Sequence, residues 1–402
     1  MIFQIKEGAV YFTSGNETDE ISSNIMESPY DQNFHKDKYG FEMSPTDIKN
    51  YAAHIFIWEY ILKNDITAPC IILENDVKLQ HTYEELCTDI DSLENEWDLI
   101  IPYNKLQEDT IPRNEIFPSR LGYYWGSYIY VINGEKITSM DCLKSIKQPI
   151  DEEILECSFN NSLKTLVIDT GWFEYDEVNC PIYKSRGSFF IEKIEKINLW
   201  EERHKEQAIE ILKYLGEKAK ELDLSLFAHA GTLLGIIRHD DIMPWDDDID
   251  LCMDENEIEL LLRAVENDNV IKFTKRIWHK TGSEYYKFFY KDGEYKEAYD
   301  YTFPFVDIWL LFRRGENLYM TSDGYEVPTT DYFPGKAYEL YKAPILVPHN
   351  HGSILQKMYK NWDKYIKVFS WSHRKKENCI DSIIAPIQTD GKGRLINLIK
   401  QN

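Results

Sequence analysis

The spacing of apolar positions predicts alternating helices and strands in the first half of the chain. Residues 51–62, "YAAHIFIWEYIL", repeat apolar positions at helical spacing. The apolar run "PCIILE" (69–74), which ends in an acid, predicts a buried strand, and "WDLIIPY" (97–103) and "YYWGSYIYVI" (123–132) are rich in the aromatic and β-branched residues that strands favour. This order predicts an α/β layer with a mostly parallel sheet.

The second half of the chain shows a different pattern, beginning around residues 185–196. A helix is predicted over about 196–222, with charged residues around one apolar face formed by Ala208, Ile211, Leu212, Leu215, Ala219 and Leu222. A strand, "LSLFAHA" (224–230), then leads into the turn and short helix that "GTLLG" (231–235) begins. Because 402 residues exceed one ordinary core, we expect two domains, 1–190 and 191–402.

Composition excludes several classes of partner. The net charge of −24 disfavours nucleic-acid binding and attachment to an anionic membrane surface, which both need clustered positive charge. We expect no signal peptide and no integral membrane segment, because the start lacks a basic region before an apolar run and no stretch has about 20 apolar residues. Seven scattered cysteines without a CxxC motif indicate reduced thiols. A cytoplasmic protein, either free or peripheral to the inner membrane face, is therefore expected.

An acidic stretch, "RHDDIMPWDDDIDLCMD" (238–254), carries the first candidate chemistry. Asp248 and Asp250 are one apolar residue apart, so in a strand both carboxylates lie on one face while Ile249 and Leu251 point into a core. Carboxylates so close repel each other unless a proton or a cation lies between them, and oxygen ligands suit Mg²⁺ or Mn²⁺. The alternative is an exposed acidic turn with Pro244 at its corner.

Neighbouring segments favour the ion site over the exposed turn. Gly231 and Thr232 follow a strand and open a helix, where backbone N–H groups and a hydroxyl can bind phosphate. Asp307 interrupts the apolar strand "YTFPFVDIWLLF" (301–312), and a carboxylate there is costly unless it is paired or bound to a metal. A Gly-Thr turn, a D-x-D strand and a third carboxylate on another strand form the layout of the nucleotidyltransferase fold.

The same residues resemble a known family. The stretch "GTLLGIIRHDDIMPWDDDIDLCM" (231–253) closely resembles the signature of the LicD family, which includes the fukutin-related proteins. The resemblance continues through "YKFFYKD" (286–292), "FVDIWLLF" (305–312) and "YFPGKAYELYKAPILVPHNHGSILQKMYKNW" (332–362). It implies transfer of a phospho-alcohol, such as phosphocholine or ribitol phosphate, from a CDP-linked donor to a glycan.

By position, this resemblance assigns roles to individual residues. It implies a metal bound by Asp248, Asp250 and Asp307, and donor phosphate near Gly231, Thr232 and Arg238. Of the pair Asp246 and Asp247, one assists as a ligand or base and the other holds the turn; Asp246 is the one we include among the catalytic candidates.

Two more donor-binding candidates lie in "EYYKFFYKD" (284–292). Lys287 and Lys291 either reach phosphate or lie solvated on one face of a strand. Tyr285 and its aromatic neighbours either form the core or supply a cage for a quaternary ammonium group through cation–π attraction, which favours choline. These neighbours are Tyr286, Phe288, Phe289, Tyr290 and Trp309.

The first half resembles, more loosely, the family 25 glycosyltransferases. The matching segments are a helix with Ala53 and His54, "ILENDV" (72–77), "WDLIIPY" (97–103), "GYYWGSYIYVINGEKITSM" (122–140) and "KQPIDEEI" (147–154). The resemblance implies a GT-A-like layer that uses a sugar nucleotide, with His54, Glu74, Asp76 and Asp151 as site candidates and Glu74 and Asp76 as metal ligands.

Two departures leave the activity of this half open. Asn75 stands where the family motif has an acid, and residues 1–43 look polar and turn-rich, without the strand that usually begins the nucleotide pocket. The half either adds a sugar or is a degenerate transferase that binds the acceptor.

Together these patterns predict an α/β protein with a GT-A-like N-terminal domain and a nucleotidyltransferase-like α+β C-terminal domain. The expected function is metal-dependent transfer of phosphocholine from CDP-choline to a sugar of a surface glycan such as lipopolysaccharide or capsule, with ribitol, glycerol or ethanolamine phosphate as alternatives. A second alternative is a glycosyltransferase whose C-terminal domain binds the acceptor. A third is a glycan-binding scaffold, which the acidic triad disfavours because buried like charges without a metal cost stability.

Overall fold

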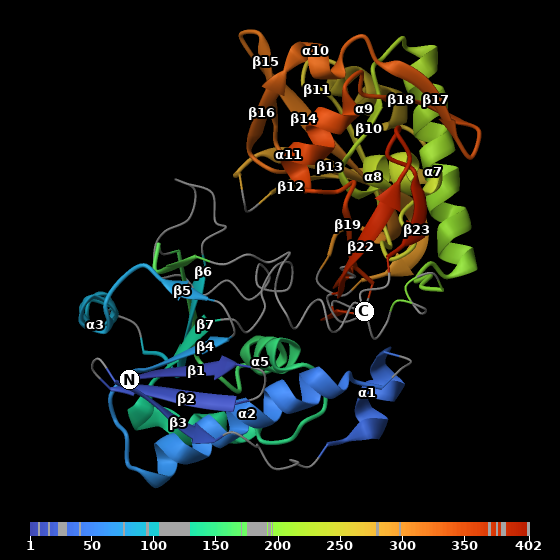
Figure 1. Ribbon diagram of the computed structural model, residues 1–402. Helices are drawn as coiled ribbons and strands as arrows, with labels where there is room; N and C mark the ends of the chain where they lie inside the picture. The colour runs from blue at the N-terminus through green and yellow to red at the C-terminus, as the bar shows by residue number, and fades with distance from the viewer. Residues whose placement is uncertain are drawn as a thin grey trace. The chain divides into compact units, whose positions relative to one another are not determined.

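The computed structural model (Figure 1) divides by its contacts into two compact units that meet in sequence between Phe190 and Ile191. The structure describes residues 1–6, 9–14, 17–22, 30–39, 42–74, 77–93, 96–103, 129–169, 171–174, 191, 194, 196–278, 281–296, 299–368, 371–374, 377–378 and 383–399.

The first unit contains a seven-stranded sheet in the order β3-β2-β1-β4-β7-β6-β8. Its strands are β1 (Ile2–Lys6), β2 (Ala9–Ser14), β3 (Glu17–Ser22), β4 (Cys70–Glu74), β6 (Leu99–Tyr103), β7 (Ile129–Ile132) and β8 (Thr165–Asp169). A separate pair joins β5 (Lys78–Leu79) to β9 (Phe173–Glu174).

Two expectations about this sheet were wrong. Residues 1–43 do contain a first strand, since β1 lies between β2 and β4, and its alternating apolar residues Phe3 and Ile5 are buried. The sheet is also mixed rather than mostly parallel, because among its described strands only β1 with β4 and β6 with β8 pair in parallel. Two residues separate β1 from β2 and β2 from β3, and such short connections permit only antiparallel pairing.

Helices complete the first unit: α1 (Gln32–Tyr39), α2 (Pro45–Lys63), α3 (Tyr83–Asp91), the 3-10 helix η1 (Gly134–Leu143) and α5 (Ile150–Phe159). The predicted helix at 51–62 is part of α2, which begins earlier because Pro45 occupies its first turn and the Ser44 hydroxyl accepts a hydrogen bond from the Asp47 N–H. Tyr51 and Trp58 on α2 are fully buried in the core.

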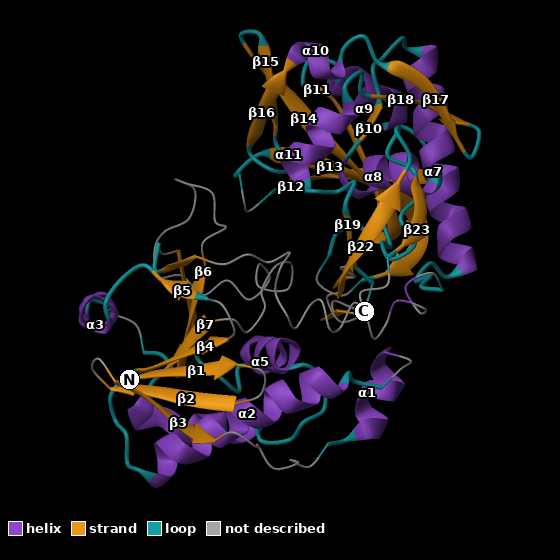
Figure 2. Ribbon diagram, viewed as in Figure 1, coloured by secondary structure: helices purple, strands orange, loops and turns teal. Residues whose placement is uncertain are grey.

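The second unit contains a nine-stranded sheet (Figure 2). The main order is β12-β13-β14-β11-β10-β18-β17, and β15 and β16 extend from β14. The bounds are β10 (Phe227–Ala228), β11 (Ile249–Asp254), β12 (Ile271–Ile277), β13 (Glu284–Tyr295), β14 (Thr302–Arg314), β15 (Asn317–Met320), β16 (Tyr325–Pro328), β17 (Lys336–Leu340) and β18 (Ala343–Val347). Smaller sheets join β19 (Tyr365–Val368), β22 (Ile383–Thr389) and β23 (Leu395–Leu398), and β20 (Trp371–Ser372) with β21 (Glu377–Asn378).

The helices of the second unit are α7 (Glu202–Glu221), α8 (Ala230–His239), α9 (Ile258–Val265), α10 (Thr329–Tyr332) and α11 (His351–Met358). The long helix α7 contacts β18 and β14. It begins six residues later than predicted, because the Leu199 N–H and the Trp200 indole donate to the carbonyls of Pro244 and Met243. Among the described helices, none combines the length and apolarity needed to cross a membrane.

Strand register brings the charged residues of the second unit together. Strand β11 pairs in parallel with β14, so Asp250 lies opposite Asp307. Strand β13 pairs with the other side of β14 in antiparallel register, which sets Lys287 opposite Asp307 as well. Residues opposite each other on neighbouring strands share one face of the sheet, so these three side chains lie on the same face.

The packing of α7 makes a testable prediction at Gly216. A Cβ added there would lie 2.6 Å from the Pro344 carbonyl oxygen, on β18. We expect Gly216→Ala to lower the free energy of unfolding by about 1–3 kcal/mol through overpacking, although alanine is the better helix former. Chemical denaturation measures this, with exposed Glu217→Ala as the control; equal or higher stability of Gly216→Ala would contradict the packing.

Candidate active site

The acidic stretch runs from the end of α8 through a turn into strand β11. Ile249 and Leu251 are fully buried, while Asp248 and Asp250 alternate with them on the more open face, as the i, i+2 spacing predicts. Carboxylate oxygens of Asp248, Asp250 and Asp307 all lie within 4.8 Å of one another. The structure therefore brings together the three residues predicted as metal ligands.

Electrostatics show that this cluster suits a cation. Burial, followed by the charges of Asp248 and Asp307, raises the pKa of Asp250 well above its ordinary value. Burial also raises the pKa of Asp307 to about 6, even though the Lys287 ammonium pulls it down. Three hard oxygen donors this close together fit a divalent ion such as Mg²⁺ or Mn²⁺.

Lys287 is the cation that the structure places beside Asp307. Its Nζ donates to both carboxylate oxygens of Asp307, at 2.9 and 2.8 Å, and the side chain is buried. The ammonium also lies 3.5 Å from the centre of the Phe305 ring, 5.2 Å from that of Tyr301 and 5.5 Å from that of Tyr285. The solvated alternative is therefore wrong for Lys287, whereas Lys291 is exposed.

Tyr285 stacks against Trp309 beside the cluster of Asp248, Asp250 and Asp307. The two rings stack at a centroid distance of 4.4 Å, and the Trp309 indole N–H donates to Asp250 Oδ1 at 2.8 Å. Trp278 packs edge-on against Trp309 at 5.4 Å. Phe288, in contrast, is a fully buried core residue. Strand β13 thus contributes aromatic side chains to both the core and the site.

The Gly-Thr turn opens α8, as predicted, and holds two of the aspartates. A Cβ added at Gly231 would lie 2.3 Å from Asp246 Oδ2, so a larger residue there would displace that carboxyl. The Thr232 hydroxyl accepts a hydrogen bond from the Asp250 N–H at 2.8 Å. Burial, then the charges of Asp248 and Asp247, raises the pKa of Asp246 well above its ordinary value.

Arg238 lies in the last turn of α8, while Gly231 and Thr232 lie in the first. The guanidinium is buried and donates to the carbonyls of Trp362 and Tyr365, at 3.4 and 3.5 Å. These contacts tie α8 to a later part of the chain. Donor binding by Arg238 stays a prediction, and its contacts are those of a residue that supports the fold.

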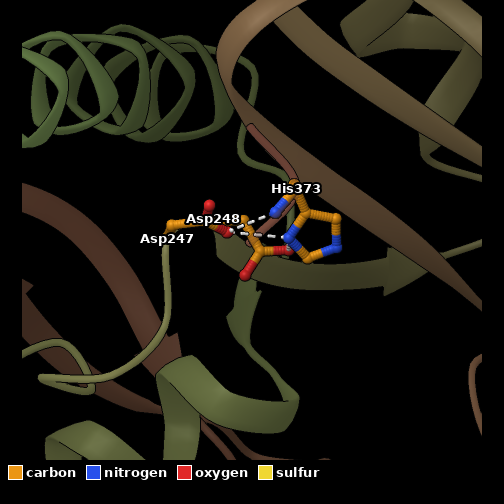
Figure 3. Close-up of side chains that lie close together, drawn as sticks. All are labelled: Asp247, Asp248 and His373. Atoms are coloured by element: carbon orange, nitrogen blue, oxygen red, sulfur yellow. Dashed lines mark hydrogen bonds and ion pairs between the residues drawn. The ribbon is translucent and has the colours of Figure 1, made fainter. Parts of the chain in front are cut away.

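The C-terminal part of the chain supplies a residue that sequence reasoning missed. His373 Nδ1 donates to Asp247 Oδ1 at 2.8 Å and lies 3.7 Å from Asp248 Oδ2 (Figure 3). Burial works to lower the pKa of His373, but the charge of Asp248 and the bond to Asp247 outweigh it and raise the pKa to about 9. The available sequence signal was a short basic run, "SHRKK" (372–376), which does not indicate a position in space.

The N-terminal candidates form a different kind of arrangement. His54 on α2 bonds Glu74 Oε1 through Nε2, at 2.9 Å, and the Tyr130 hydroxyl through Nδ1, at 2.6 Å. Both His54 and Glu74 are buried, so Glu74 belongs to the core network around His54. Asp151 is also buried, in the first turn of α5. Asp76, the predicted partner of Glu74, lies outside the described residues.

The fold and site of the second unit define a nucleotidyltransferase-type domain: a mixed sheet presents a D-x-D strand and a third carboxylate beside a helix that opens with Gly-Thr. Residues 223–350 match the family model described as LicD/FKTN/FKRP, nucleotidyltransferase domain. Residues 3–129 match the one described as glycosyltransferase family 25 (LPS biosynthesis protein). The two matches confirm both family resemblances and their order along the chain. The chain carries two transferase-type domains.

A curated relative adds a distant similarity. An uncharacterized protein of Rickettsia prowazekii (strain Madrid E) is 26% identical to the chain over 164 residues. The alignment covers 40% of this chain and 57% of the relative, so the chain spans little more than half of that protein's length. This similarity assigns no activity.

The raised pKa of Asp307 predicts that protons compete with a bound ion. At pH 5, with a pKa of about 6, roughly ten Asp307 carboxyls are protonated for each ionised one, so this group alone should weaken Mn²⁺ binding about tenfold relative to pH 7.5. The ion-free protein should lose the stability contributed by protonated Asp307 as the pH rises through 6. Mn²⁺ should therefore raise the melting temperature more at pH 7.5 than at pH 5. Equal affinity by calorimetry at both pH values would contradict the site.

The buried His54–Glu74 pair predicts a stability effect. Glu74→Ala leaves the His54 ring buried without this partner and opens a cavity, so we expect the free energy of unfolding to fall by about 3 kcal/mol or more. Denaturant titration measures this against Glu84→Ala, an exposed control on α3. A loss no larger than that of the control would show that the pair does not support the core.

Proposed function

We propose that the second unit transfers a phospho-alcohol from a CDP-linked donor to a hydroxyl of a glycan, in a reaction that needs a divalent ion. The observation that carries the proposal is the convergence of Asp248, Asp250 and Asp307 within 4.8 Å, beside the Gly-Thr start of α8. The match of residues 223–350 to the LicD/FKTN/FKRP model supports the same class of chemistry.

The ion would be held by Asp248, Asp250 and Asp307, and when bound it supplies positive charge to the diphosphate and the departing CMP. Trp309 fixes Asp250 through its indole N–H, and Thr232 fixes the backbone of the same residue. The first turn of α8 presents backbone N–H groups of the kind that bind phosphate.

The proposed reaction is a displacement at phosphorus. The acceptor oxygen forms a bond to the phosphorus that bears the alcohol, the bridging P–O bond breaks, and CMP leaves with the bridging oxygen. The proton of the acceptor hydroxyl passes to a carboxylate, for which we propose Asp246 Oδ2. Burial beside Asp248 raises the pKa of Asp246, which makes its ionised form a stronger base than an ordinary aspartate.

Phosphocholine is the group we propose for transfer. Trp278, Tyr285 and Trp309 provide aromatic faces next to Asp250, and such faces attract quaternary ammonium groups. The aromatic rings of Phe305, Tyr301 and Tyr285 already bind one cation, the Lys287 ammonium. Ribitol, glycerol and ethanolamine phosphate remain the alternatives to test.

For the first unit we propose sugar transfer or acceptor binding, on the strength of the family 25 match over residues 3–129. Strand β1 pairs in parallel with β4, which indicates that the sheet of the first unit is intact and not truncated at its N-terminal end. A surface glycan precursor is the proposed acceptor, and the cytoplasmic face of the membrane stays the predicted location.

The direct test incubates the full chain with Mg²⁺, a glycan acceptor and a panel of CDP-choline, CDP-ethanolamine, CDP-glycerol and CDP-ribitol, and measures CMP release. We expect CDP-choline to be turned over fastest. Asp250→Asn should lower the rate at least about a hundredfold, because it removes one charge from the ion site. Asp292→Asn, the same exchange at an exposed aspartate on β13, is the matched control. If no donor of the panel is bound or turned over, the proposal fails.

A second assay separates the glycosyltransferase alternative. Labelled sugar nucleotides are supplied with the same acceptor, and sugar transfer by the wild type is compared with transfer by Asp250→Asn. Sugar transfer without CMP release from any CDP-alcohol would favour a glycosyltransferase whose second unit binds the acceptor.

A further inference from the structure

The segment Trp371–Arg374 lies against the acidic cluster although it follows the family-matched residues 223–350. Strand β20 ends at Ser372, and His373 and Arg374 come directly after it. In Figure 3 the His373 ring lies beside the carboxylates of Asp247 and Asp248. None of the predicted site residues belongs to this part of the chain.

Asp247 holds this segment with both of its oxygens. Oδ1 accepts from the N–H and the Nδ1 of His373, at 3.2 and 2.8 Å, and Oδ2 accepts from the Ser372 hydroxyl and the Arg374 N–H, at 3.0 and 3.4 Å. A carboxylate has about four lone-pair positions, and these bonds use all of them. Asp247 is therefore placed to hold the segment rather than to bind an ion, although its oxygen lies near Asp248.

Arg374 anchors the other end of the segment. Its Nε donates to both carboxylate oxygens of Glu294, at 3.1 and 3.0 Å, and its guanidinium pairs with Glu201. Glu294 is on β13, the strand of Lys287, and Glu201 directly precedes α7. Asp247 in the acidic turn, Glu294 on β13 and Glu201 before α7 thus fix three consecutive residues, Ser372, His373 and Arg374.

These bonds leave the His373 ring little freedom. Nδ1 is committed to Asp247, and the ring meets the Phe305 ring edge-on at a centroid distance of 5.4 Å. In this position Nδ1 faces Asp248 Oδ2 at 3.7 Å. Asp248 is a member of the ion-binding triad, so the ring restricts where one of the three ligands can move.

We propose that the segment Trp371–Arg374 completes the ion site. Asp247 holds the segment in place by its hydrogen bonds, and His373 is a positioning residue for Asp248. The inference rests on the ion site of the proposed function. Residues that orient a metal ligand without binding the metal typically contribute 10–100-fold to metal affinity or activity. The nitrogen that matters is Nδ1, because that atom makes the bond to Asp247 and faces Asp248.

The test measures Mn²⁺ affinity of the full chain by electron paramagnetic resonance, without donor or acceptor. Asparagine places its amide nitrogen near the position of Nδ1, whereas glutamine places it near Nε2. We expect H373A and H373Q to weaken Mn²⁺ binding about tenfold or more, and H373N to stay within about threefold of the wild type. His349→Ala, an exposed histidine elsewhere in the unit, is the control.

Thermal unfolding without the ion accompanies each titration. If H373A does not fold, the pair H373N and H373Q decides, because both keep an amide donor and differ in where it lies. Equal affinity of all variants would overturn the proposal, and so would tighter binding by H373A, which would mark His373 as a cation that competes with the ion. Absence of Mn²⁺ binding by the wild type would overturn the ion site and this inference together. Binding that depends on His373 without CMP release would overturn only the proposed reaction.

Discussion

Mutual repulsion among Asp248, Asp250 and Asp307 is the constraint around which the second unit is arranged. The pairing of β11 with β14 forces two of these carboxylates to lie opposite each other. Burial disfavours the charged form of Asp250 and Asp307, and the charge of Asp248 adds to this effect, so the pKa of each lies above the ordinary range. Lys287 offsets part of this charge from β13, and Trp309 and Thr232 hold Asp250 in place. A divalent ion would offset the rest.

Each aspartate of the acidic run has a separate partner, and these partners divide the run by role. Asp246 lies against Gly231, which leaves it room by having no side chain. Asp247 binds the segment around His373 with both oxygens. Asp248 and Asp250 face the third carboxylate across the strands. Neighbouring residues thus have different contacts because the chain changes from a turn to a strand within them.

The sequence was informative where a pattern is local. The D-x-D alternation, Asp307 in its apolar strand and the Gly-Thr helix start all follow from spacing within a few residues, and the structure brings them together. The mixed direction of the first sheet follows in part from the short connections among β1, β2 and β3. The pairing of Lys287 with Asp307 depends on strand register, and the His373–Asp247 bond joins residues 126 positions apart. No local pattern encodes either contact, and the burial of Glu74 beside His54 likewise follows from packing.

The most direct test of the ion site is diffraction from crystals of the full chain grown with Mn²⁺ and a CDP-alcohol, using the anomalous signal of manganese. We predict a peak bounded by the carboxylates of Asp248, Asp250 and Asp307, with the donor diphosphate on its open side and the His373 ring at its edge. A manganese peak elsewhere in the second unit, with these three carboxylates free of metal and donor, would contradict the account.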